Sequence, residues 1–286
     1  MVIVRKVSLV VVLCVLGVWC GTTYGAEFKI GIMQDDKDAV ARYKPVESYL
    51  AKKGIEITYL EMPNYSTAAS MFNSGKVDGM FSGSGLAGIF IMRDLAVPVV
   101  RPVLKDGVNT YHAVILAPKG APKYTGNWEY FKGKTIAFTA LASAGEIFYR
   151  SIPNIKLAQA TIYKVASHGA AIDALAKGSI DVAIVKNHVW NRQKSKYPNI
   201  ELAGEDLEEN PDSTLIVSKK ADANTVSQVS SALLGLKDDK SSEANLVREE
   251  MGIKGYIKTV NKDFEHTFQL LQRSGADSPS FNFYFQ

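Results

Sequence analysis

The alternation of short apolar runs with amphipathic stretches of helical spacing is the feature that most constrains how this chain can fold. The helical stretches end at glycine, as at Gly54, Gly75 and Gly178, and glycine is favoured directly after a helix because it adopts positive φ without strain. Strands that alternate with helices in this way form a mostly parallel sheet with helices on both of its faces. The pattern therefore predicts an α/β fold.

The predicted elements run along the chain in two successive series. The first series has strands at 28–33, 55–60, 77–81 and 97–104, with helices at 39–53, at 65–74 and from the following Gly/Ser turn to about residue 94. The second series has strands at 110–117, 135–138, 161–166, 180–185 and 214–218, with helices at 143–151, 169–177, 224–236, 241–251 and 261–273. Two series of this kind indicate two lobes.

Two ten-residue segments, 71–80 and 174–183, share one pattern: a helix end, a glycine, one residue, an aliphatic residue, an aspartate and a strand. Two lobes of one architecture explain the repeat, and a common helix–turn–strand form that recurs by chance is the alternative. The length of 286 residues also fits two domains at about 150 residues each. We assign 27–110 to the first part of lobe 1, 111–212 to lobe 2, and 213–286 to the return into lobe 1 with the C-terminal helices.

The segment 1–26 has the pattern of a secretion signal. Arg5 and Lys6 precede an apolar run at 7–19, which is shorter than the roughly 20 residues that a membrane-spanning helix needs. Small residues follow, and we expect cleavage after Gly25 or Ala26. The segment therefore predicts a periplasmic protein, and an uncleaved N-terminal anchor is the alternative.

Composition and motif searches exclude several classes of function. Both cysteines, Cys14 and Cys20, lie inside the predicted signal, so cysteine catalysis and thiolate metal sites are excluded for the mature chain. The four histidines lack metal-ligand spacing, and no Walker loop, G-x-G-x-x-G turn or G-x-S-x-G motif occurs. The net charge of +4 comes without a long basic run, which gives no electrostatic support for nucleic-acid binding. We therefore predict a protein that is not an enzyme and has no cofactor and no metal. We also expect it to be a monomer.

Four turns rich in small or polar residues stand at the predicted carboxyl ends of strands. Ligands bind at this edge of parallel sheets, and helix N-termini there offer N–H groups to anions. The four turns are Pro63–Thr67, Ser82–Gly85, Ala140–Gly145 and Ala166–Gly169. One such turn is also typical of a simple helix cap, whereas two in each half indicate an anion site in a cleft between lobes.

The mature chain resembles the periplasmic substrate-binding proteins of phosphate, phosphite and phosphonate ABC transporters. The resemblance covers nearly the whole mature chain and depends on the order and spacing of short motifs. These are Gly31–Asp36, Tyr43–Pro45 with Tyr49–Leu50, Tyr65 before a helix, Gly75–Asp78, Phe131–Lys134, Ser143–Gly145, and Ser167–His168 before Gly178–Asp181. The resemblance implies a type II periplasmic-binding fold, in which two α/β lobes joined by two crossing strands close on a ligand. We place the crossing strands near 111–117 and 213–218.

The resemblance also implies how a ligand is held. Hydroxyls and amides at a helix start would hold phosphonyl oxygens, and an acidic residue would bind a ligand amine. The predicted ligand contacts are Tyr65, Ser66, Ser82, Gly83, Ser84, Ser143, Ala144, Gly145, His168 and, for the amine, Asp212. Alanine stands at two of three hydroxyl positions of the helix start, and Ala87 stands where the family has a ligand-contacting tyrosine. These departures favour a smaller or less charged ligand, or a receptor role.

We therefore predict an exported solute-binding protein that captures a small anionic ligand, similar to phosphate or a phosphonate, by lobe closure. Its partner would be an ABC permease in the inner membrane. The alternative is a periplasmic sensing protein that partners a sensor kinase or chemoreceptor. An enzyme on the same scaffold is a third hypothesis, for which the sequence offers no nucleophile–base pair and no metal cluster.

Overall fold

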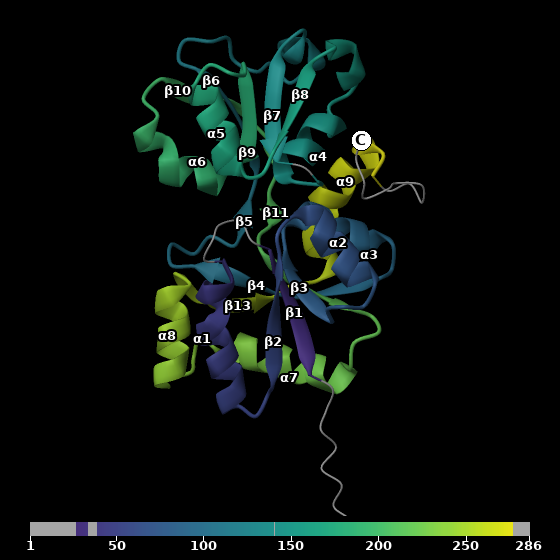
Figure 1. Ribbon diagram of the computed structural model, residues 1–286, viewed down its shortest axis with the longest axis vertical. Coiled ribbons are helices and arrows are strands. Elements are labelled where there is room, and N and C mark those ends of the chain that lie inside the picture. Colours follow the sequence, from purple (N-terminus) through teal and green to yellow (C-terminus); the bar gives the residue numbers. More distant parts are fainter. Residues whose placement is uncertain (1–26, 34–38, 140, 277–286) are drawn as a thin grey trace, which may run out of the picture.

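The computed structural model describes residues 27–33, 39–139 and 141–276. The predicted secretion signal lies outside the described residues. Figure 1 shows two α/β lobes stacked along the long axis of the molecule, with two short strands passing between them. Within the described part of the chain, none of the helices has the length and apolar character that a membrane crossing requires.

The six-stranded sheet of lobe 1 has the order β13-β4-β12-β3-β1-β2. Its strands are β1 (Phe28–Met33), β2 (Ile57–Met62), β3 (Gly79–Ser82), β4 (Ala96–Leu104), β12 (Thr214–Ser218) and β13 (Ile253–Lys258). β1 runs parallel to β2 and β3, whereas β12 and β13 run antiparallel to their neighbours. Lobe 1 is discontinuous in sequence, because β12 and β13 come from the chain beyond lobe 2.

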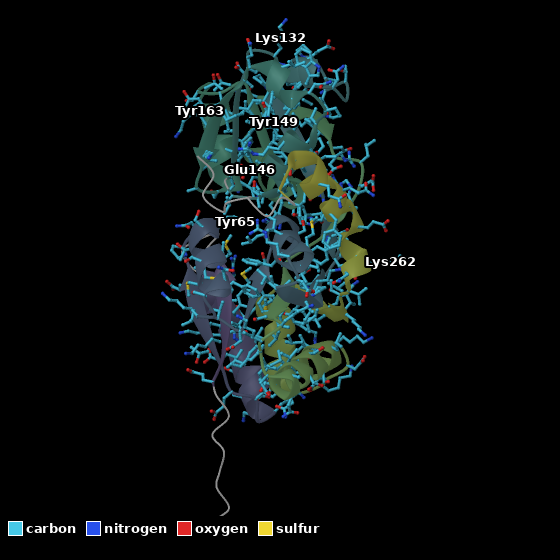
Figure 2. The ribbon with its side chains drawn as sticks, turned by 90° about the vertical axis from the view of Figure 1, so that its right-hand side faces the viewer. Tyr65, Lys132, Glu146, Tyr149, Tyr163 and Lys262 are labelled. Carbon is cyan, nitrogen blue, oxygen red and sulfur yellow. The ribbon has the colours of Figure 1, made fainter. Side chains whose placement is uncertain are left out.

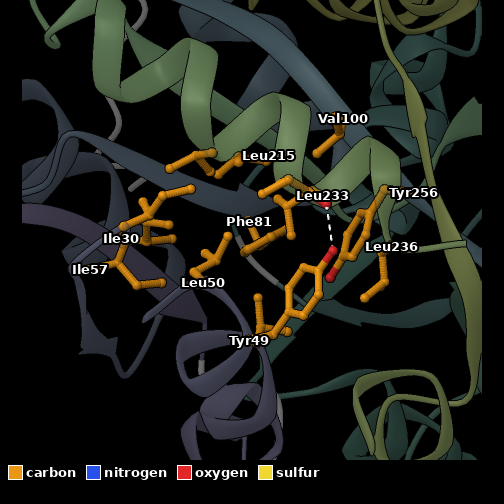
Figure 3. Packing of buried hydrophobic residues seen from close by; sticks show 14 of the residues in the cluster. Ile30, Tyr49, Leu50, Ile57, Phe81, Val100, Leu215, Leu233, Leu236 and Tyr256 are labelled. Atoms are coloured by element: carbon orange, nitrogen blue, oxygen red, sulfur yellow. Dashed lines mark hydrogen bonds between the residues drawn. The ribbon is translucent and has the colours of Figure 1, made fainter. Parts of the chain in front are cut away.

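Helices cover both faces of the lobe 1 sheet, and an apolar core lies on each face. These helices are α1 (Ala39–Lys52), α2 (Tyr65–Asn73), α3 (Ser84–Met92), α7 (Ala223–Gly235) and α8 (Ser242–Glu250). Figure 3 shows the larger core, in which Tyr49 of α1 donates a 3.0 Å hydrogen bond to the Ala232 carbonyl of α7. A fully buried side chain such as Leu50 contributes about 1.5–3 kcal/mol to folding. The helices are thereby fixed on the sheet whose edge carries the candidate turns.

The five-stranded sheet of lobe 2 has the order β10-β6-β9-β7-β8. Its elements are β6 (Ala113–Pro118), β7 (Thr135–Thr139), β8 (Thr161–Val165), β9 (Val182–Lys186), β10 (Ile200–Glu205), α4 (Ala144–Ser151), α5 (His168–Ala176) and α6 (Asn187–Gln193). Short 3-10 helices lie at Trp128–Phe131, Ile155–Ala158, Lys194–Lys196 and Asn261–Phe264. A Cβ at Gly145 of α4 would lie 2.2 Å from the carbonyl oxygen of Ile184 in β9, so only glycine allows this helix to sit so close to the sheet.

Both sheets are mixed, which corrects the prediction of mostly parallel sheets. The βαβ units keep parallel pairing, as in β1 with β2 and β7 with β8. β12, however, enters lobe 1 directly from a crossing strand and therefore runs opposite to β3. β6 enters lobe 2 in the same way and pairs antiparallel with β9. The two passages between the lobes thus account for the antiparallel pairs of β12 and β6, whereas β13 follows α8 within lobe 1 and also pairs antiparallel with β4.

Two short antiparallel strands, β5 (Thr110–Tyr111) and β11 (Asn210–Pro211), join the lobes. The positions predicted for the crossing strands, 111–117 and 213–218, are wrong. Those residues mainly form β6 and β12, the first strand in each lobe after a crossing. A two-residue strand carries no periodic pattern, and the long apolar runs beside β5 and β11 therefore supplied the visible signal.

Helix α9 (Glu265–Ser274) lies against both lobes, as Figure 1 shows. One apolar cluster joins it to them. The buried members of this cluster include Ile89 of α3, Ile147 of α4, and Leu270 and Leu271 of α9. Thr267 Oγ1 of α9 also donates a buried 2.6 Å hydrogen bond to Asn210 Oδ1 of β11. The lobes are therefore held together along this side of the crossing strands.

Candidate functional site

A cavity of about 600 Å³ lies between the lobes, and a smaller one of about 50 Å³ shares part of its wall. Among the described residues, the charged side chains that line the larger cavity are Arg42, Lys186, Arg192 and Asp212, and the histidines are His168 and His188. The described residues contain no group of three or more His, Cys, Asp or Glu side chains placed to hold a metal ion. The described wall therefore has three cationic side chains and one carboxylate.

Lys186, at the end of β9, forms an ion pair with Asp212, which follows the crossing strand β11. Lys186 Nζ lies 2.5 Å from Asp212 Oδ1, and only 18% and 15% of the two side chains are exposed. The same nitrogen lies 4.2 Å from the centre of the Tyr111 ring in β5, within the distance of a cation–π interaction. The pair connects lobe 2 to both crossing segments at the cavity wall.

Asp212 is ionised and surrounded by donors. Burial raises the pKa of Asp212, but the ammonium group of Lys186, with smaller contributions from His188 and Ser213, outweighs burial, and the net pKa lies below its ordinary value. Ser213 Oγ donates to Asp212 Oδ1 over 3.2 Å. His188 Nε2 lies 3.7 Å from Asp212 Oδ2 and 2.8 Å from the Thr110 carbonyl oxygen. Because a carbonyl only accepts, His188 Nε2 carries a proton.

His168 begins α5, and the hydroxyl of Ser167 caps this helix by accepting the Ala170 N–H over 3.2 Å. Burial and, to a smaller extent, repulsion by the Lys186 ammonium group lower the pKa of His168 to about 3. The imidazole is therefore neutral at physiological pH. Its Nδ1 atom is buried without a hydrogen-bond partner among the described residues. A neutral imidazole on the cavity wall offers a ligand a donor or an acceptor, according to its tautomer.

Tyr65, Ser82 and Gly83 come together at the smaller cavity, where Lys186 and Ser213 complete the polar part of the wall. Tyr65 begins α2 and also lines the larger cavity. A Cβ on Gly83, the residue before α3, would lie 3.8 Å from the Tyr65 hydroxyl oxygen, so the starts of the two helices are neighbours. Figure 2 shows Tyr65 at the junction of the two lobes.

Two other predicted contacts of lobe 1 line neither cavity. Ser84 is fully buried, and its hydroxyl shares a 2.5 Å hydrogen bond with the Tyr111 hydroxyl. Ser66 is exposed on the first turn of α2. Ser84 therefore supports the crossing strand β5, while Ser66 is exposed to solvent outside both cavity walls.

The predicted anion site at the start of α4 does not line either cavity. Ser143, Ala144 and Gly145 are all buried. Ser143 Oγ accepts the Glu146 N–H over 3.2 Å and donates to the Thr139 carbonyl. Ala144 belongs to the apolar core of lobe 2. These residues cap α4 and pack it on the sheet.

The carboxylate of Glu146 lies at the N-terminus of α4, where the predicted anion would bind. Its side chain is fully buried, Oε2 accepts the Ala142 N–H over 2.8 Å, and Oε1 accepts a 2.9 Å hydrogen bond from Arg150 Nε. The order Ser143-x-x-Glu146 is the sequence pattern of a capping box. Figure 2 shows Glu146 in lobe 2, near the junction with lobe 1. The positive end of α4 is thus compensated by the protein's own carboxylate.

Among the charged and histidine side chains of the larger cavity, sequence reasoning missed Arg42, Lys186, His188 and Arg192. Lys186 did have a signal, because it is a charged residue at the carboxyl end of the apolar strand 182–186, the edge at which the candidate turns were found. His188 lies two residues beyond the same strand, in α6, and no motif in the sequence marks it as a ligand contact. Arg42 and Arg192 lie inside helices, and nothing in their neighbouring sequence separates them from other surface cations.

One family model matches most of the chain. A family model described as the periplasmic substrate-binding protein of a phosphonate ABC transporter matches residues 30–264. No match was found among the curated proteins.

Solved structures with the same architecture cover most of the chain. XAC2383 from Xanthomonas citri bound to ATP is 15% identical, with a TM-score of 0.72 over 88% of this chain and 98% of that one. PhnD1 from Prochlorococcus marinus in complex with methylphosphonate is 17% identical, with a TM-score of 0.71 over 87% and 98%. A binding-protein component of an ABC phosphonate transporter from Pseudomonas aeruginosa is 15% identical, with a TM-score of 0.69 over 88% and 89%. These likenesses confirm the predicted type II periplasmic-binding fold.

Proposed function

This chain belongs to the family of periplasmic substrate-binding proteins of phosphonate ABC transporters, and from this premise we propose that it is exported, captures a small anion between its lobes and delivers it to an ABC permease. Members of this family bind a solute for transport, and the family is not an enzyme family. The ligand accordingly leaves the cleft chemically unchanged. The family description names a transporter component and gives no preference to the sensor hypothesis.

The charge of the cavity wall is the observation that carries the proposal. Arg42, Lys186 and Arg192 line the larger cavity together with a single described carboxylate, Asp212, which is already paired with Lys186. Cationic walls in a cleft of low dielectric raise the local concentration of anions and their rate of binding. The cavity volume of about 600 Å³ lies within the range of small-molecule sites. Phosphate, a phosphonate or a small carboxylate agrees with both the positive charge of the wall and the volume of the cavity.

We assign the ligand contacts to Tyr65, Ser82, Gly83, His168 and Lys186. The first three come from lobe 1 and the last two from lobe 2, so a ligand that touches both sets favours the closed arrangement of the lobes. The two-residue strands β5 and β11 are where a hinge rotation would be absorbed. The start of α4 is left out of this assignment, because Glu146 already compensates it.

The proposal is tested by titrating the purified protein with phosphate, phosphite, methylphosphonate, sulfate and acetate in a thermal-shift assay, followed by calorimetry. A ligand present at about 100 times its Kd adds about 2.7 kcal/mol to the free energy of unfolding, which raises Tm by several degrees. His168→Ala should weaken binding at least about tenfold, the loss of a good hydrogen bond. Ser66→Ala serves as the control. Ser66 is exposed on the first turn of α2, next to Tyr65, and its replacement should leave the Kd unchanged. A well-folded protein that binds none of these anions refutes the proposal.

A further inference from the structure

We propose that the cleft binds anions that carry an apolar substituent, and that an apolar rim on lobe 1 holds this substituent. The rim consists of Tyr43, Leu104, Met251 and Ile253, which all line the larger cavity. This inference rests on the proposed function, which is that the cleft holds a small anion. It adds to that function the class of the ligand, namely an oxyanion with an alkyl or aryl group.

The two lobes contribute different chemistry to the described wall of the larger cavity. The side chains from lobe 2 are mainly polar, such as Ser167, His168 and Arg192, with Val189 as an apolar exception. The side chains from lobe 1 are mainly apolar, with Arg42 as a charged exception. A ligand that contacts both lobes therefore meets polar groups on one side and apolar groups on the other.

The apolar rim is the end of the larger core of lobe 1. Ile253 belongs to this core and is only 3% exposed, while Tyr43, Leu104 and Met251 pack against the core and are partly exposed. The apolar interior of the lobe thus continues up to the cavity wall. Burial of apolar surface that water can reach favours binding, so a ligand group that covers the rim gains affinity.

Contacts within lobe 1 hold the rim in place. Leu104 of β4 lies opposite Ile253 of β13 in the sheet, and the Leu104 N–H donates a 2.7 Å hydrogen bond to the Val108 carbonyl. The Tyr256 hydroxyl donates to the Met251 sulfur over 3.6 Å. A surface that is already ordered costs little entropy when a ligand binds to it.

The rim adjoins the proposed anion contacts. Tyr43 lines both cavities, and the smaller cavity also contains Tyr65, Ser82 and Gly83. An anion held there can extend its substituent past Tyr43 into the larger cavity. Cavities of about 300–1,000 Å³ are typical of drug-sized ligands, and the larger cavity has about 600 Å³. A bare oxyanion therefore leaves most of this volume unfilled, whereas an alkyl or aryl group fills more of it.

The experiment varies the apolar group and keeps the head group. It is a calorimetric titration of the wild-type protein with methyl-, propyl- and pentylphosphonate. Each buried methylene lowers the Kd about fourfold, so we expect pentylphosphonate to bind at least about tenfold more tightly than methylphosphonate. The heat-capacity change of binding should become more negative along the series. 2-Hydroxyethylphosphonate has nearly the shape of propylphosphonate and should bind more weakly.

Variants of the rim locate the apolar group. Met251→Gln and Leu104→Asn should each reduce the ratio of the methylphosphonate Kd to the pentylphosphonate Kd at least about threefold and leave the methylphosphonate Kd nearly unchanged. Met251→Leu keeps the rim apolar and should keep the ratio, which separates polarity from damage to the fold. Leu246→Gln is the matched control, because Leu246 is an exposed apolar residue of α8 that lines neither cavity.

The outcomes separate the inference from the proposed function. Equal affinity of the wild type for methyl- and pentylphosphonate overturns the inference and leaves the proposed function standing. A preference for pentylphosphonate that both polar variants retain also overturns it, because the apolar group then packs elsewhere. Binding of no tested anion by cooperatively melting wild-type protein refutes the proposed function, and the inference falls with it.

Discussion

Removal of the Glu146 carboxylate should destabilise the protein far more than removal of any exposed acid. The side chain is fully buried, and its two oxygens accept hydrogen bonds from the Ala142 N–H and from Arg150 Nε. Loss of a hydrogen bond to a charged group costs about 1.5–3 kcal/mol, and loss of a helix cap costs about 1 kcal/mol. Glu146→Ala should therefore lower the free energy of unfolding by about 3 kcal/mol. We add nothing for the ion pair itself, because Arg150 is one-third exposed.

The assay is urea-induced unfolding followed by circular dichroism, together with thermal melting. For a chain of this size, about 3 kcal/mol corresponds to a fall in Tm of about 6–12 °C. Glu146→Gln keeps the shape and one acceptor and should lose about half as much. Glu249→Gln, an exposed acid in α8, should stay within about 0.5 kcal/mol of the wild type. If Glu146→Ala melts within about 1 °C of the wild type, the carboxylate does not stabilise α4 as we argue.

Two further predictions concern packing and pH. Gly145→Ala should lower the free energy of unfolding, measured by urea denaturation, by about 3 kcal/mol or more, because its Cβ would lie 2.2 Å from the Ile184 carbonyl oxygen. Gly235→Ala, at the open end of α7, should be neutral or stabilising. Equal effects of the two changes would argue against the close approach of α4 to β9. The pKa of His168 falls from 6.5 to about 3 on folding. Below pH 6.5 the unfolded chain therefore takes up a proton that the folded protein does not. As a result, the free energy of unfolding should decrease toward pH 3 by at most about 1.4 kcal/mol per pH unit. His168→Gln should flatten this dependence between pH 7 and pH 5, and an unchanged slope would contradict the burial of the imidazole.

The parts of the fold that repeat along the sequence could be predicted from it. The βαβ units show a strand, a helix that ends in glycine, and a second strand, and this pattern places β1 to β3 and β7 to β9 near their observed positions. Strand β13 was missed because Lys254, Gly255 and Lys258 interrupt the apolar pattern of Ile253–Lys258, and the strand is held by its pairing with β4. Long-range pairing of this kind leaves no local signal.

The candidate site likewise contains residues that local sequence could place and residues that only the folded structure brings together. Tyr65, Ser82, Gly83 and His168 follow strand ends, and local sequence could place them on the cavity wall. The start of α4 follows the same rule, yet Glu146 fills it, and whether a nearby carboxylate turns inward is decided by packing. The expectation that Asp212 binds a ligand amine came from the resemblance alone. The ion pair with Lys186 joins the end of β9 to the residue after the crossing strand β11, a meeting that sequence spacing does not reveal.

The discontinuity of lobe 1 sets an order for the folding of the newly made chain. Every strand of the lobe 2 sheet lies between residues 113 and 205, so lobe 2 can close its sheet as soon as that stretch is available. The sheet of lobe 1 needs pairings such as Ser82 with Thr214, and loop-closure entropy makes such distant contacts slow to form. The lobe that begins first along the chain is therefore completed last, and the cavity between the lobes comes into being only in that final step.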